Sequence, residues 1–307
     1  MGPQEIHRRQ IEVHVGPARG GLRDVASRVR DYRQRGFTWV GAHVVAPGPV
    51  HDMSADFQID VEAGRIQRAK GEMALAAFDG TPDTRFQGCR DILPNLADLS
   101  GLALDEGLVG GIRQAIGRER GCYHLTTLVL TTAPVLRALS LVSLAPEDSW
   151  RRALSLSGSA LGSGRYRFEG EIRDERPQAG PASTHLAFEV ETRGMRLGEV
   201  VVERGSARVR DPQAEALLGG MSLAAGFAPQ LLARVGTPEL EPVRELALGL
   251  SSIVTQVLIA GGVPDAVPTT PKPSRATDTC WMWRQAGPLE AMEVGIGDEP
   301  PPGGAGD

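Results

Sequence analysis

The 307-residue chain has little of several features that decide protein class. Its three cysteines, an odd number in a chain of this length, do not make a disulfide framework and favour a reducing cytoplasm. Lys70 and Lys272 are its two lysines, and with a net charge of −5 nothing builds the basic face that nucleic-acid binding needs. The longest apolar run, near 253–262, is too short to span a bilayer, and the N-terminus lacks the apolar core of a signal peptide. We therefore expect a cytoplasmic protein with no nucleic-acid and no membrane partner.

Several sequence motifs are also missing. No G-x-G-x-x-G follows a strand and no G-x-x-x-x-G-K-[ST] occurs, so we expect no nucleotide cofactor. There is no G-x-S-x-G turn for a serine nucleophile, no pair of C-x-x-C motifs and no H-E-x-x-H. Any metal or catalytic site must therefore be built from single residues that are far apart in the sequence.

The chain contains two similar halves. A strand-like stretch ends at Asp31 in the first half, and a matching stretch ends at Asp174 in the second. His51 and His185 each open an extended run. Two Leu/Gly-rich segments, 99–107 and 218–226, then precede helix-like segments in the same order. Because the matches recur in order over several blocks, we interpret the chain as a diverged tandem duplication.

The periodicity of apolar residues predicts the elements of each half. Period-two alternation predicts strands around 53–59 and 186–190. Spacings of three and four predict helices over 108–116 and 125–139 in the first half, and over 227–235 and 243–259 in the second. Strands followed by helices indicate an α+β fold. We expect two copies, each with an antiparallel sheet of about three strands covered by helices, packed pseudo-symmetrically.

The domain boundaries follow from composition. The first α+β repeat, residues 1–145, holds the candidate site, and residues 160–262 form the second, degenerate repeat. The stretch around 145–164, rich in Ser and Gly, is predicted to be a linker. A Pro-rich linker is expected at 263–277, a strand-like extension at 278–296 and a disordered tail at 297–307.

Thiol and imidazole groups concentrate in the first half. Cys122 and His124 are two residues apart before a predicted helix, and the second half has no counterpart. His51 stands at the start of a strand and Cys89 just before another helical stretch. A helix N-terminus favours the thiolate, which binds metal or acts as a nucleophile. We expect His51, Cys89, Cys122 and His124 to be metal ligands, with zinc or iron as the metal that suits mixed sulfur and nitrogen ligands.

Other readings of these residues stay open. Each cysteine alone is more often inert core, and His51 alone could cap a strand. Without a metal, Cys122 would be the nucleophile and His124 or His51 the base, with Asp52 as a further acid–base group. Residues two apart on a helix diverge in direction, so Cys122 and His124 can share a site only if Cys122 precedes the first turn. His7-Arg8-Arg9 and Asp31 are interpreted as a structural charge pair at a sheet edge, and Cys280 as packing beside its tryptophans.

Taken together, these motifs resemble an uncharacterised bacterial family of unknown function. The resemblance covers about residues 5–140 and 277–290, and its family members are shorter, so the second repeat looks inserted. In the family a His follows the late Cys, whereas Trp281 stands there, which argues against a ligand near Cys280. The motifs are His7-Arg8-Arg9, Asp31, His51-Asp52-Met53, Cys89, Gly121-Cys122-Tyr123-His124-Leu125 and Thr279-Cys280.

A more distant similarity is to the iron–sulfur-cluster scaffold fold. His51, Gly88-Cys89 and Cys122 stand in the order of the scaffold ligands. His51 replaces a Cys, and Gly121 replaces a His. The similarity therefore implies a related fold with a different use of the site, not cluster transfer.

Three functions are compatible with these observations. The first is a small-molecule enzyme of bacterial secondary metabolism, with lyase, hydrolase or cyclase chemistry at a metal held by the Cys/His set. The second is a metal-free cyclase, hydratase or thioesterase with a cleft between the repeats, in a double hot-dog arrangement whose sheets wrap long central helices. The third is a non-catalytic binding or metal-carrier protein. A small-molecule substrate is expected for the enzymes, and a homodimer is a further expectation.

Overall fold

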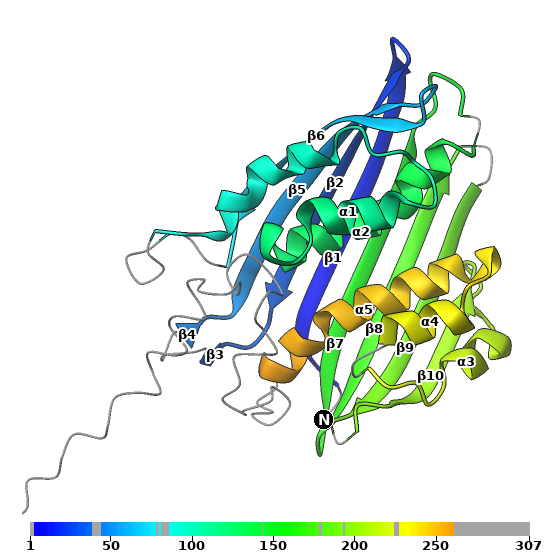
Figure 1. Ribbon diagram of the computed structural model, residues 1–307. Coiled ribbons are helices and arrows are strands. Elements are labelled where there is room, and N and C mark those ends of the chain that lie inside the picture. The colour runs from blue at the N-terminus through cyan, green and yellow to red at the C-terminus, as the bar shows by residue number, and fades with distance from the viewer. Residues whose placement is uncertain are drawn as a thin grey trace, which may run out of the picture.

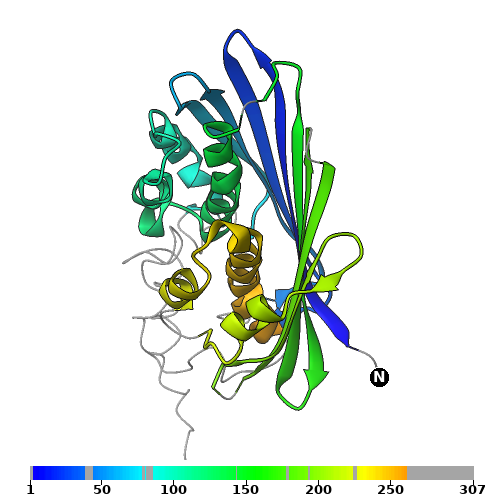
Figure 2. The same ribbon diagram turned by 90° about the vertical axis from the view of Figure 1, so that its right-hand side faces the viewer.

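A computed structural model gives the fold of the chain. It describes residues 3–38, 44–77, 80, 86–142, 144–177, 180–192, 194–223 and 227–260. A single antiparallel sheet of nine strands runs through the molecule in the order β11-β10-β9-β8-β7-β1-β2-β5-β6 (Figure 1). The helices cover one face of this sheet (Figure 2). The expected α+β class, with an antiparallel sheet covered on one face, is therefore confirmed.

The long strands alternate buried and exposed residues, because successive side chains on a strand point to opposite faces. On β2, for example, Val25 and Val29 are buried among exposed neighbours. The first half contributes β1 (Gln4–Arg19), β2 (Leu22–Arg33), β5 (Gly48–Asp60) and β6 (Arg65–Leu75). β3 (Phe37–Thr38) and β4 (Val44–Val45) form a separate two-stranded sheet. The second half contributes β7 (Trp150–Gly162), β8 (Arg165–Arg176), β9 (Gly180–Glu191), β10 (Leu197–Arg204) and β11 (Val209–Arg210).

The expectation of two sheets of about three strands each is wrong. β1 pairs with β7 from Gln4↔Ala160 to Val15↔Trp150, and this pairing fuses the two halves into one sheet. The predicted linker at 145–164 mostly forms β7. Its Ser and Gly content is typical of a linker, but the segment is a strand. Leu154 and Leu156 are buried on one face of this strand, and the serines between and after them point to the other face.

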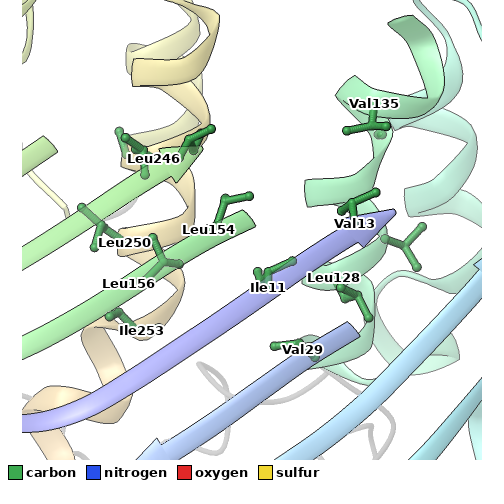
Figure 3. Packing of buried hydrophobic residues seen from close by; sticks show 14 of the residues in the cluster. Ile11, Val13, Val29, Leu128, Val135, Leu154, Leu156, Leu246, Leu250 and Ile253 are labelled. Atoms are coloured by element: carbon green, nitrogen blue, oxygen red, sulfur yellow. The ribbon is translucent and has the colours of Figure 1, made fainter. Parts of the chain in front are cut away.

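Two long helices form the second layer. α2 (Tyr123–Leu139) packs on β1, β2 and β5, whereas α5 (Glu241–Ala260) packs on β1, β7, β8 and β9. Figure 3 shows Leu246, Leu250 and Ile253 of α5 over Leu154 and Leu156 of β7. The other helical elements are η2 (Cys89–Leu99), α1 (Leu108–Ile116), η3 (Arg118–Arg120), α3 (Pro212–Leu218), α4 (Phe227–Arg234) and η4 (Pro238–Leu240).

α5 links the two halves as well as covering the second. It belongs to the second half by sequence, yet it contacts β1 and α2 of the first. The helices predicted over 108–116 and 243–259 agree with α1 and α5 to within two residues at each end. Among the residues that the structure describes, no helix is both long and apolar enough to cross a membrane. The predictions for 263–277, 278–296 and 297–307, including Cys280, lie outside the described residues.

Candidate functional site

Three neighbouring strands place a buried polar cluster on the helix-covered face of the sheet. Arg9 of β1 stands directly opposite Asp31 of β2, and Asp31 stands opposite His51 of β5. Arg9 donates from Nε to Oδ1 of Asp31 at 2.6 Å and from its terminal nitrogen to Oδ2 at 2.8 Å. His51 Nδ1 lies 2.9 Å from Oδ2. The carboxylate of Asp31 therefore holds a guanidinium on one side and an imidazole on the other.

The charge of Asp31 is well stabilised despite its burial. Burial alone would raise the pKa of this carboxyl, but the charge of Arg9 and the hydrogen bonds from Arg9 and His51 hold the pKa well below its usual range. Asp31 is therefore ionised at neutral pH. An ionised carboxylate accepts hydrogen bonds only, so His51 carries a proton on Nδ1, and Nε2 is the nitrogen that can offer a lone pair to a metal.

The predicted charge pair of His7, Arg8, Arg9 and Asp31 does not lie at the edge of the sheet. β1 and β2 lie inside the sheet with strands on both sides, and Arg9 and Asp31 are fully buried. His7 joins them, with Nε2 3.5 Å from Oδ1 of Asp31, and burial lowers its pKa. Arg8 faces the opposite way, as alternation along β1 requires, and pairs with Glu5 at 2.8 Å.

The N-terminus of α2 brings Cys122 and His124 to the same cluster. Cys122 is the N-cap residue of this helix, with extended backbone angles (φ −96°, ψ 132°), so it precedes the first turn. Its Sγ therefore reaches to 3.9 Å from Nδ1 of His124. The His124 ring stacks on the His51 ring, with centroids 3.8 Å apart. The condition set by the two-residue spacing is met, because Cys122 lies in extended backbone before the first helical turn.

The chemical state of the two groups follows from their neighbours. A hydrogen bond from Cys89 contributes most to holding the pKa of the Cys122 thiol well below its usual range, and His124 and the Leu125 backbone N–H add to it against the effect of burial. Burial, with the nearby His51 and Arg9, lowers the pKa of His124 to about 4. At neutral pH the site therefore favours a thiolate beside a neutral imidazole.

The structure also places two residues of α5 at the site that the sequence analysis missed. Ser252 Oγ accepts a hydrogen bond from Arg9 at 2.7 Å, and the side-chain amide of Gln256 contacts Nε2 of His124. Ser252 and Gln256 lie one helical turn apart and so face the same way. No sequence signal marks either residue, since an isolated Ser or Gln in an amphipathic helix is common.

Asp52, expected as an acid–base group, is separated from this cluster. It follows His51 on β5 and therefore points to the uncovered face of the sheet. There it accepts two hydrogen bonds from Arg28, at 2.6 and 2.5 Å, which lower its pKa. The prediction that Asp52 shares the site is thus corrected, and Asp31 is the carboxylate that contacts His51.

The site offers donor atoms of the kind that a metal ion binds. Asp31, His51 and His124 each present one such atom, all within 4.8 Å of one another. Cys122 adds a thiolate next to His124, and Cys89 adds a second sulfur next to Cys122. Nε2 of His51 is buried and has no hydrogen-bond partner in the described part of the chain. The four predicted ligands are thus linked by successive contacts, from His51 to His124, to Cys122 and to Cys89, whereas the set whose donor atoms all lie within 4.8 Å of one another is Asp31, His51 and His124.

Comparisons with known proteins give a match to a family model. No curated protein and no solved structure matches the chain, so the likeness to the iron–sulfur scaffold fold stays a prediction. The match covers the part of the chain that contains His7, Arg9, Asp31, His51, Cys89, Cys122 and His124, but neither Ser252 nor Gln256. It confirms the resemblance to a family without known function: residues 7–137 match the family model described as "Protein of unknown function (DUF2889)".

Proposed function

We propose that His51, Cys89, Cys122 and His124 form a zinc or iron centre of a small-molecule enzyme, with Asp31 orienting His51. The observation that carries the proposal is the state of His51. Its Nδ1 is bound to an ionised carboxylate, its Nε2 is buried and lacks a hydrogen-bond partner among the described residues, and its ring stacks on that of His124. A carboxylate on the far nitrogen is the usual outer partner of a metal-binding histidine.

Asp31 is better suited to orienting a ligand than to being one. Both of its oxygens accept hydrogen bonds from Arg9, whose positive charge would stay next to any ion that Asp31 bound. Arg9 donates its described side-chain hydrogen bonds to Asp31 and Ser252 and not to the sulfur and nitrogen atoms, although its charge is near enough to lower the pKa of His124. A sulfur and a nitrogen bound to one tetrahedral zinc lie roughly 3.5 Å apart, and Cys122 Sγ lies 3.9 Å from His124 Nδ1. A small movement of either side chain would complete such a pair.

Charge balance does not decide whether a cation binds here. Arg9 and Arg33 are both buried near Asp31, and with the lowered pKa of the Cys122 thiol the positive and negative charges of the cluster come close to balance. The case for a metal rests on the donor atoms instead. A bound metal would polarise a carbonyl or activate water, in line with lyase, hydrolase or cyclase chemistry on a small-molecule substrate.

The experiment that tests the proposal is metal binding by matched variants. We expect His51→Ala and Cys122→Ser to weaken zinc binding in competition with a coloured chelator. Asp52→Asn is the matched control, because Asp52 adjoins His51 in sequence but faces the other side of the sheet. Equal zinc affinity in all three variants and the wild type would overturn the proposal.

A metal-free reaction is the second candidate, supported by the contact between Cys122 Sγ and His124 Nδ1. A thiolate beside a neutral imidazole is the arrangement of a cysteine nucleophile with its base. Turnover that persists in a chelator, on protein shown to be free of metal, would favour this candidate over the first.

We further propose that the two halves are diverged copies, as expected from the sequence. Arg152 of β7 stands opposite Asp174 of β8 and binds it through two hydrogen bonds, at 2.8 and 2.7 Å. This buried pair repeats Arg9 and Asp31, each residue being 143 positions further along the chain.

The segments that precede the helices repeat the same backbone hydrogen bonds. Ile66 N–H donates to the carbonyl of Leu102 at 2.9 Å, and Leu197 N–H donates to the carbonyl of Met221 at 2.8 Å. Leu102 and Met221 are the residues that the sequence comparison aligned. This agreement supports the duplication independently of the Arg–Asp pairs.

The register of β1 on β7 has the symmetry that a duplication predicts. Arg9 pairs with Leu156 and Val13 pairs with Arg152, which are the same contact seen from each half. Ile11 pairs with Leu154, its own counterpart 143 positions along, so the pseudo-twofold axis would pass between these two buried residues. One fused interface, rather than a cleft, would then relate the copies.

The second copy would not hold a second metal centre. Trp150 takes the position of His7 and donates to Asp174 at 2.9 Å, while Ala182 stands opposite Asp174, where the first half has His51. His185, which the sequence comparison aligned with His51, stands opposite Glu171 instead. We therefore place the centre in the first copy only.

A further inference from the structure

The second half supplies a residue that faces a proposed metal ligand of the first half. Gln256 lies near the end of α5, and its side-chain amide contacts Nε2 of His124. The other ring nitrogen, Nδ1, faces Sγ of Cys122. The group that Gln256 presents to Nε2 therefore decides what His124 presents to Cys122.

A carboxamide can be placed in two ways, because its oxygen accepts and its NH2 group donates. If the NH2 group faces His124, it donates to Nε2, and the ring proton must sit on Nδ1, pointing at the Cys122 sulfur. If the oxygen faces His124, it accepts the Nε2 proton, and Nδ1 carries the lone pair. Only the second arrangement leaves His124 able to bind a metal next to Cys122.

We propose that Gln256 is a positioning residue whose amide oxygen accepts the Nε2 proton of His124 and so makes Nδ1 the metal-binding atom. The inference rests on the metal centre proposed above. Turning the amide over exchanges its oxygen and its NH2 group, so the buried end that points away from His124 does not decide between the two placements. The choice follows from the metal centre, which requires the lone pair on Nδ1 of His124.

The proposal gives both histidines the same kind of support from opposite directions. Asp31 fixes Nδ1–H of His51 and leaves Nε2 for the metal, while Gln256 fixes Nε2–H of His124 and leaves Nδ1. The two supports come from different halves of the chain. The second half would then be needed for the site although it carries none of the four proposed ligands.

Cobalt(II) titration of the full-length protein tests the inference, because cobalt reports its sulfur and nitrogen ligands through visible absorption. We expect Gln256→Leu, which removes both polar ends, to weaken cobalt binding by about 10- to 100-fold. We expect Gln256→Glu, which has only acceptor oxygens, to bind at least as tightly as the wild type with the same spectrum. Weaker binding by Gln256→Glu would show that Gln256 acts as a donor, and would overturn the inference.

Two controls separate this role from a structural one. Ser251→Ala lies on the same helix, loses only a bond to the Leu248 carbonyl within it, and should leave cobalt affinity unchanged. Urea unfolding of the metal-free proteins should show Gln256→Leu fully folded without urea, with a midpoint lowered only by the loss of its hydrogen bond to His124. Unchanged cobalt affinity in Gln256→Leu would refute the positioning role, whereas a wild type that binds no cobalt would refute the metal centre itself.

Discussion

At the scale of single residues, Asp31 joins the packing of the sheet to the proposed chemistry. It neutralises a guanidinium that has no access to water and at the same time orients His51. Removing one partner of a buried ion pair leaves the other charge uncompensated, which costs more than the pair itself contributes.

We therefore predict that Asp31→Asn lowers the free energy of unfolding by about 3–5 kcal/mol, since Arg9 would be left buried without a counter-charge. Urea denaturation measures this change. Asp52→Asn is the control, because its partner Arg28 is about half exposed and such pairs contribute roughly 0–1 kcal/mol. Equal losses in the two variants would argue against a special role for the buried pair.

A second prediction concerns Glu245 of α5, which lies 2.8 Å from Arg152. Burial raises its pKa from the usual 4.5 to about 7, and Arg152 offsets only part of this effect. The folded state thus holds this proton more tightly than the unfolded state. The stability that results is present below pH 4.5 and is lost as the pH rises through 7.

Glu245→Gln should remove this pH dependence. Its free energy of unfolding relative to the wild type should rise between pH 4.5 and pH 8, by roughly 3 kcal/mol at most. Urea titrations of both proteins at several pH values measure the difference. A difference that stays constant over this range, or falls, would mean that Glu245 is ionised at low pH by its contact with Arg152.

Residues of the site differed in how well the sequence predicted them. Cys122 and His124 were recognised because they are close in the sequence, and His51 and Cys89 because such residues are few. The link between Arg9 and Asp31 was seen, but their place inside the sheet depends on which strands pair. Gln256 was missed, because its role arises only when α5 of one half packs over the other.

At the scale of elements, the start of α2 depends on Gly121. A Cβ at this residue would lie 1.8 Å from the backbone carbonyl oxygen of Ile116, a contact that no side-chain movement relieves. The chain can therefore turn into Cys122 only if residue 121 has no side chain.

We predict that Gly121→Ala destabilises the protein and weakens zinc binding, since Cys122 must shift with the displaced backbone. Gly110→Ala in α1 is the matched control: its Cβ would meet nothing within 4 Å, and Ala in a helix should add about 0.5–1 kcal/mol. Thermal unfolding and zinc competition measure both effects. A Gly121→Ala protein with wild-type stability and affinity would contradict this account of the turn.

Elements with a strong period were predicted well, whereas β7 was not. The helical spacing of α1 and α5 follows directly from apolar residues three and four apart. In β7 the same kind of signal, Leu154 and Leu156 at period two, was outweighed by the serines and glycines between them. The serines face the uncovered side of the sheet, whereas Gly158 is buried on the covered side, where an added Cβ would lie 2.5 Å from the Val257 side chain of α5.

At the scale of the whole molecule, the pairing of β1 with β7 makes the two halves one sheet. Ile11 and Leu154 meet at the centre of this pairing and are both buried. The sequence predicted the two similar halves but not their fusion, because the register between distant strands is set by their joint packing under α2 and α5.

Ile11→Ala should therefore destabilise the entire protein and not one half. We predict a loss of about 2–5 kcal/mol with a single unfolding transition retained in calorimetry. Val209→Ala on β11, where Val209 is 65% exposed, should change stability by less than about 0.5 kcal/mol. Two separate transitions in Ile11→Ala would indicate that the halves unfold independently.

The most direct test of the metal centre is the metal content of the full-length protein purified without added metal, combined with X-ray absorption at the metal edge. The account predicts about one zinc or iron ion per chain, bound by both sulfur and imidazole nitrogen. Protein that folds with far less than one ion per chain, and that takes up none from a zinc or iron(II) solution, would contradict it.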